Sequence, residues 1–232
     1  MKSKLILIVL SVLALTNVSS TSIKEALSTD NQTPSTVKIE RIQDGTSTVV
    51  FDDGKEYGYK FTIPSGWYPL AMPPTTDEVE DLKDIIEEHD LPLDDEWINR
   101  NILSTNEGLE LVVVNLDPNH YQNNSPDGLL IFSTQIPEST PNWFLIFTTQ
   151  ISNSVEGINT ADTKKIGNQY VSIIEFSFFY KEGEEEKNSS GKMLLFVRNS
   201  KLFIFAGATQ NDEWLANVNS AMDEIYSTLE FN

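Results

Sequence analysis

Hydrophobic and polar residues alternate most clearly in the last third of the chain. Between residues 170 and 180 the even-numbered positions are mostly aromatic or aliphatic, whereas Glu175 and Ser177 fall on the other face. A period of two is typical of a β-strand, because successive side chains point to opposite faces of a sheet. The pattern predicts a strand over residues 170–180 and a polar turn over residues 181–191.

Two further runs, residues 192–198 and 201–209, are apolar on both of their faces. In the first run Leu194 and Phe196 occupy one face, and the odd-numbered residues beside them are apolar too. Residues 199–200 between the runs fit a two-residue hairpin turn. Strands of this kind predict a sheet that is covered on both sides, by helices or by a second sheet.

The end of the chain predicts an amphipathic helix that covers one side of this hairpin. Asp212 stands at a suitable N-cap position, and apolar side chains recur after it at helical spacing. These apolar residues are Trp214, Val218, Ala221, Met222, Ile225 and Leu229.

The first half of the chain predicts a small antiparallel meander followed by mixed elements. The meander comprises three short runs, 37–42, 48–51 and 57–63, separated by Asp-Gly turn sequences. Thr75 and Glu78 have capping-box spacing at the start of a helix. The other expected elements are helices over 75–89 and 94–103, and strands over 109–116 and from 129. Residues 143–151 fit either a strand or a helix, and their Phe, Ile and Thr content favours a strand. Together they indicate an α+β fold with a mainly antiparallel central sheet.

The N-terminus has the layout of a secretory signal peptide. Lys2 and Lys4 precede an apolar run from Leu5 to Leu15, and small polar residues follow it. The run is shorter than the ~20 residues of a membrane-spanning helix. A buried N-terminal helix or a single membrane anchor is the alternative. The expected divisions are a signal peptide over residues 1–20, a flexible linker over 21–36 and a single domain over 37–232, located outside the cytoplasm.

The composition of this domain limits the classes of partner that it can bind. The chain has 16 Lys and Arg against 35 Asp and Glu, a formal net charge of −19. Nucleic acids and anionic lipids bind cationic patches, so they are excluded as expected partners. The chain has no cysteine, which excludes disulfides, thiolate ligands, cysteine nucleophiles and a lipid-acylated N-terminal cysteine. We therefore expect no membrane insertion once the signal peptide is removed.

The most acidic segment, residues 76–96, gives one candidate site. Glu80, Asp84, Glu87 and Glu88 offer carboxylates for Ca²⁺, which prefers several oxygen ligands, or a docking face for a basic protein. The favoured interpretation is the solvated outer face of an amphipathic helix.

The loop after residue 116 gives a second set of candidate ligands in Asp117, Asn119 and Asp127. It departs from a calcium-binding loop, because Gln122 replaces the required glycine and Gly128 the bidentate glutamate. A connector rich in turns is favoured over a calcium site.

Enzymatic chemistry has little support in the sequence. The only histidines, His89 and His120, lie outside any zinc-binding spacing. His89 is expected at the end of the first helix, and His120 in a polar loop. There is no GxSxG elbow and no glycine-rich phosphate loop. Paired carboxylates for glycoside hydrolysis remain a weak alternative, since abundant acids alone do not indicate them.

Two segments resemble the PsbP-like α/β/α sandwich superfamily, which includes the photosystem II extrinsic subunit, a Ran-binding nuclear import factor and DcrB-type exported proteins. They are GYKFTIPSGW, in the third run of the meander, and the final helix DEWLANVNSAMDEIYSTLEF. The resemblance covers roughly residues 55–70 and 165–230. It implies a three-layer α/β/α sandwich and a non-catalytic role in binding or assembly.

These observations lead to one expected function and two alternatives. We expect an exported, monomeric, non-catalytic binding or accessory protein with an unidentified protein partner and no cofactor. A calcium-dependent binding module is the first alternative, and an extracytoplasmic hydrolase is the second.

Overall fold

The computed structural model describes residues 36–52, 58–103, 108–122, 125–126, 128–135, 158–182, 185–198 and 200–232. Its helices are α3 (Thr76–Glu88), α4 (Asp95–Asn101) and α6 (Leu215–Thr228), with 3₁₀ turns η1 (Pro118–His120) and η2 (Asp212–Trp214). Its strands are β1 (Thr36–Arg41), β2 (Ser47–Asp52), β3 (Tyr59–Ile63), β4 (Trp67–Ala71), β5 (Leu109–Asn115), β6 (Tyr121–Gln122), β7 (Ser125–Pro126), β8 (Gly128–Gln135), β9 (Ile158–Ile166), β10 (Gln169–Glu182), β11 (Glu185–Arg198), β12 (Lys201–Thr209) and β13 (Glu230–Phe231). The predicted signal peptide, the linker before Thr36 and the segment 143–151 lie outside the described residues.

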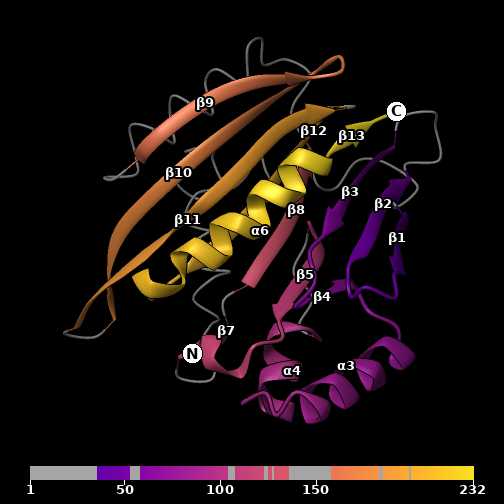
Figure 1. The fold of residues 1–232 in the computed structure, drawn as a ribbon, viewed down its shortest axis with the longest axis vertical. Coiled ribbons are helices and arrows are strands. Elements are labelled where there is room, and N and C mark those ends of the chain that lie inside the picture. Colours follow the sequence, from indigo (N-terminus) through magenta and orange to yellow (C-terminus); the bar gives the residue numbers. More distant parts are fainter. Residues whose placement is uncertain are drawn as a thin grey trace.

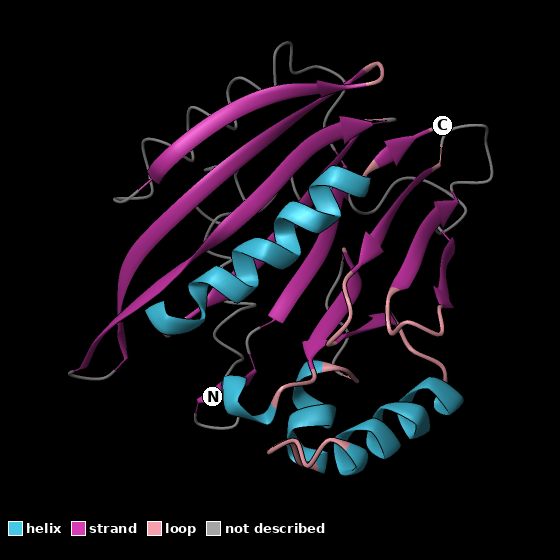
Figure 2. Cartoon of the chain, viewed as in Figure 1, coloured by secondary structure: helices cyan, strands magenta, loops and turns pink. Residues whose placement is uncertain are grey.

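The strands form an α+β fold built on antiparallel sheets (Figure 2). The large sheet has seven strands in the order β4-β5-β8-β12-β11-β10-β9. The predicted meander forms a four-stranded sheet in the order β1-β2-β3-β13, and β6 and β7 make a separate short ladder. Because β13 comes from the end of the chain and pairs with β3, the small sheet joins both ends of the described part.

The late strands are buried on both faces, as their composition predicted. On β11, Leu194 and Phe196 belong to one core, whereas Met193 and Leu195 belong to another. All four side chains are at most 2% exposed. Because neighbouring residues of a strand point to opposite faces, the two cores lie on opposite sides of the large sheet.

Helix α6 covers one of these faces together with the small sheet (Figure 1). Val218 and Met222 of α6 are fully buried in the same core as Phe61 of β3 and Phe205 of β12. Gly207 of β12 lies directly beneath the helix: a Cβ atom there would stand 2.8 Å from Met222 Cγ and 3.0 Å from Val218 Cγ1. The cover predicted for this face is therefore a helix and a second sheet side by side.

Helices α3 and α4 cover the other face near β4, β5 and β8. Leu82 of α3 and Ile98 of α4 are buried with Val112 and Leu130 of the sheet. The capping box predicted at the start of α3 is confirmed: Thr75 Oγ1 accepts from Glu78 N, and Glu78 Oε2 accepts from Thr75 N. His89 is the C-cap of α3, where it was expected.

Two local predictions are wrong, and one strand was not predicted. Most of the expected polar turn is strand, because β11 begins at Glu185 and its Ser189 and Ser190 are at most 2% exposed. Asp212 does not cap the last helix: Asn211 Oδ1 accepts from Glu213 N at the start of η2, and α6 follows without a side-chain cap. The sequence analysis also missed β4, the edge strand that follows the Gly66 turn.

Candidate functional site

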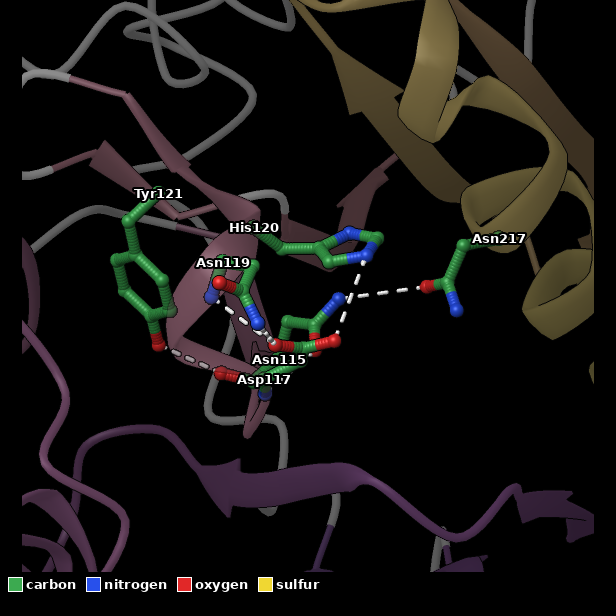
Figure 3. Close-up of polar contacts among 6 residues, drawn as sticks. All are labelled: Asn115, Asp117, Asn119, His120, Tyr121 and Asn217. Carbon is green, nitrogen blue, oxygen red and sulfur yellow. Dashed lines mark hydrogen bonds and ion pairs between the residues drawn. The ribbon is translucent and has the colours of Figure 1, made fainter.

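The polar cluster with the richest chemistry lies where β5 ends beside the start of α6 (Figure 3). Asn115, the last residue of β5, is 3% exposed. Its Nδ2 donates to Asn217 Oδ1 at 3.3 Å, and its Oδ1 accepts from Asp117 N at 3.0 Å. Its carbonyl oxygen accepts from the Tyr121 hydroxyl at 2.5 Å. One buried amide therefore joins the strand, the following loop and α6.

Asp117 organises the loop itself. It is the N-cap of η1, and its Oδ1 accepts from Asn119 N at 2.9 Å and from Asn119 Nδ2 at 2.8 Å. Its Oδ2 lies 3.7 Å from His120 Nε2. The hydrogen bond from the Asn119 backbone is the main cause that lowers the pKa of the Asp117 carboxyl below its usual value. The Asn119 side chain and the charge of His120 act in the same direction, and partial burial opposes them.

His120 is packed against an aromatic ring. Its side chain is 14% exposed, and its ring stacks on Trp214 with centroids 5.1 Å apart and planes 26° apart. The loop around His120 is polar, as expected, but the ring itself is mostly covered. Trp214 precedes α6 and reaches this loop only in the folded chain, so the sequence of the loop contains no sign of the contact.

We call this cluster the clasp, because it holds the loop after β5 against the start of α6. The clasp comprises Asn115, Asp117, Asn119, His120 and Trp214. Each residue bonds or stacks within the set or onto its two neighbours, Tyr121 and Asn217. Asp117 and Asn119 form a turn, in agreement with the turn-rich connector that the sequence favoured for this loop. Asp127, the third candidate ligand of the loop, lies outside the described residues.

The other candidate ligands, Glu80, Asp84, Glu87 and Glu88, are all exposed on α3. The acidic residues that follow α3 in the sequence make contacts with residues close to them in the chain. Asp94 Oδ1 accepts from Trp97 N at 2.7 Å as the N-cap of α4, and Asp95 lies 2.7 Å from Lys83 Nζ. Across the part of the chain that the structure describes, no group of three or more His, Asp or Glu is arranged to hold a metal ion.

The sequence analysis did not predict the buried cation Lys192, which lies under α6. The side chain of Lys192 is 6% exposed, and its Nζ lies 2.5 Å from Asp223 of α6 and 3.4 Å from Glu175 of β10. The alternation of β11 already places Lys192 on the face of Leu194 and Phe196, so a covered cation was readable from the sequence. The positions of its two partners, Asp223 and Glu175, were not readable from the sequence.

Comparisons with known proteins give similarity of structure without similarity of sequence. No protein-family model and no curated protein matches the chain. It is similar to the solution structure of cyanobacterial PsbP (CyanoP) from Synechocystis sp. PCC 6803, with a TM-score of 0.39 and 14% identity over 88% of this chain and 98% of that one. It is also similar to the crystal structure of LpqN, described as involved in cell envelope biogenesis of Mycobacterium tuberculosis, with a TM-score of 0.43 and 11% identity over 92% of this chain and 96% of that one.

The similarity to a PsbP that the sequence predicted is thus found among solved structures. This similarity concerns the fold alone. Within the described residues, none of the helices combines the length and the apolar character needed to cross a membrane.

Proposed function

We propose that this chain is an exported, non-catalytic binding or accessory protein that works outside the cytoplasm and docks a partner protein on α3. The observation that carries the proposal is that α3 is amphipathic, with one buried apolar face and one exposed acidic face. Leu82 is fully buried against the large sheet, whereas the opposite row is exposed. This row, the acidic row of α3, comprises Glu80, Asp84, Glu87 and Glu88.

The acidic row attracts a basic protein surface. Lys83, the one cation of α3, is paired with Asp95 and so does not neutralise the row. Complementary charge speeds the encounter of two proteins and selects against partners of like charge. The partner class we propose is therefore a protein with a cluster of Lys or Arg.

The scaffold we propose behind this surface is a single domain over residues 37–232, arranged as a three-layer α/β/α sandwich. In this arrangement α6 and the small sheet form one outer layer, and α3 and α4 form the other. Its support is the pair of cores on opposite faces of the large sheet. The pairing of β13 with β3 supports the single domain, because it joins the end of the chain to the meander.

The clasp supports a non-catalytic role. Asp117 Oδ1 already accepts two hydrogen bonds from Asn119, and the His120 ring is covered by Trp214. These groups hold the loop after β5 against the start of α6. We propose that they serve the fold, and that the binding role belongs to the acidic row.

The test is affinity capture of partners from the extracytoplasmic fraction of the native cells. The variant carries Glu80→Gln, Asp84→Asn, Glu87→Gln and Glu88→Gln. The matched control neutralises four other exposed acids, Glu40, Asp212, Glu213 and Glu224. We expect at least tenfold less partner with the α3 variant, unchanged capture with the control, and release of the partner by added salt.

Equal capture by the α3 variant and the wild type would contradict the role of the acidic row. A hydrolytic activity that disappears in His120→Gln, with the melting temperature unchanged, would favour the hydrolase alternative instead.

A further inference from the structure

Among the strands that the structure describes, β9 ends the large sheet, and none of them pairs with its outer edge. At one end of the sheet, β4 lies beside the small sheet, where Arg41 Nη2 of β1 donates to the Pro69 carbonyl at 3.4 Å. At the other end, β9 is the last of the described strands, beside β10 (Figure 1). Side chains from Thr160 to Lys165 are exposed on both faces of the sheet. Within the described residues, this edge is therefore unpaired and can accept another strand.

A side-chain hydrogen bond shows which backbone groups of β9 point outward. Thr163 lies opposite Ser172 of β10, but Thr163 N donates to the side chain of its neighbour, Asp162 Oδ1, at 2.8 Å. The N–H therefore faces away from β10. Hydrogen-bonding direction alternates along an antiparallel strand, so Ala161 and Lys165 present their N–H and C=O groups on the same outer edge.

We propose that a second copy of this chain pairs with β9, antiparallel and about a two-fold axis through Thr163. In this register Thr163 faces Thr163 of the second copy, and Ala161 faces Lys165 of the second copy. All of these residues have outward N–H and C=O groups, so they form hydrogen-bonded pairs. The two large sheets then continue into each other across the interface.

The same register brings opposite charges together. It places Asp162 opposite Lys164 of the second copy, and Lys164 opposite Asp162 of the second copy. These are non-hydrogen-bonded positions, where facing side chains come closest and an ion pair gains most. In the single chain, Lys164 Nζ lies 3.8 Å from Asp162 Oδ2. Pairing therefore exchanges one contact within each copy for two equivalent contacts between copies.

This self-complementarity is the reason for choosing a second copy as the occupant. Lysines on an edge strand commonly discourage pairing with other strands. Here each Lys164 meets an aspartate when the strand pairs with itself, and no like charges face each other. The net charge of −19 opposes association, but separated surface charges are screened beyond ~8 Å at physiological ionic strength. The monomer expected from the sequence is therefore replaced by a monomer–dimer equilibrium.

The first test is sedimentation velocity of the purified protein over a range of concentrations, with Thr163→Pro as the variant. Proline removes the central N–H, and edge strands tolerate it where that N–H faces outward. Thr163→Val is the matched control, because it keeps the N–H and loses the same hydroxyl contact with Ser172. We expect dimers of the wild type and of Thr163→Val, and at least tenfold weaker dimerisation of Thr163→Pro.

The second test exchanges charges, and it decides the matter even where Thr163→Pro does not fold. Asp162→Lys alone places lysines opposite each other, and Lys164→Asp alone places aspartates opposite each other. Each variant should be monomeric with a native circular dichroism spectrum, and an equimolar mixture of the two should form heterodimers. A wild type that stays monomeric at its highest soluble concentration, a Thr163→Pro dimer as tight as the wild type, or a mixture without heterodimers would each overturn the proposal.

Discussion

Asp117 shows how one side chain can determine the shape of a loop. Its carboxylate caps η1, bonds both nitrogens of Asn119 and faces His120. Because these partners favour the charged form, the pKa of Asp117 is lowered on folding. The clasp is therefore coupled to pH through this residue.

We expect Asp117→Asn to lower the free energy of unfolding at neutral pH by about 0.5–1 kcal/mol, within the range measured for exposed ion pairs. Asparagine still offers an oxygen that can cap η1, so the loss comes from the negative charge that faces His120. A group whose pKa is lowered on folding stabilises the protein above its unfolded pKa, about 3.9 for Asp. That contribution is lost as the pH falls through the folded pKa. The difference between wild type and variant, measured by urea unfolding, should thus be present at pH 7 and shrink below about pH 4.

Asp84→Asn is the matched control, because Asp84 is exposed on α3. It should change stability by no more than about 0.5 kcal/mol. A cost of Asp117→Asn that stays the same at low pH would contradict the role of the carboxylate.

At the scale of elements, the contact between α6 and the large sheet depends on the absence of a side chain. Gly207 has no positive φ to explain its choice, but its neighbours leave no room for a Cβ atom. Gly191 plays a similar part between strands, where a Cβ atom would lie 2.0 Å from the Gly207 carbonyl oxygen. The two glycines allow helix and strands to approach closely.

We expect Gly207→Ala to lower the free energy of unfolding by about 1–3 kcal/mol, the usual cost of overpacking a core. The nearest atoms to its Cβ are side-chain atoms of Leu129 and Met222 and not backbone atoms, so the core can adjust in part. Met222→Ala makes room for it, and the double variant should lose less stability than the sum of the single variants. Strict additivity in urea unfolding would show that α6 does not rest on Gly207.

At the scale of the whole molecule, net charge governs how the protein responds to ions. With a formal charge of −19, the folded chain repels itself, and added salt should raise its melting temperature by screening. Calcium at millimolar concentration should do no more than magnesium at equal ionic strength.

Thermal unfolding in the two salts checks this expectation. A larger rise with calcium would favour the calcium-dependent alternative, because a ligand that binds the folded state stabilises it by mass action. Loss of that extra rise in Asp117→Asn would assign the ion to the loop, and its loss in the α3 variant would assign it to the acidic row.

Prediction from the sequence succeeded where burial and local pattern agree. The capping box at Thr75 and the two-faced apolar strands β11 and β12 needed only neighbouring residues and the periods of helix and strand. It failed for residues 185–191, which are polar but continue β11. Their strand is decided by pairing with β10 and β12, and Ser177 and Ser190 satisfy each other across that ladder.

The sequence by itself thus determined the meander, helices α3 and α4, strands β10 to β12, the two-sided core and the acidic character of α3, because each depends on spacing within one segment. Only the tertiary structure decided that Trp214 covers His120, that Asp223 pairs with Lys192, and that β9 is left at the edge. These features join residues that are distant in the chain. Their partners are chosen by the order of strands in the sheet, which no local pattern encodes.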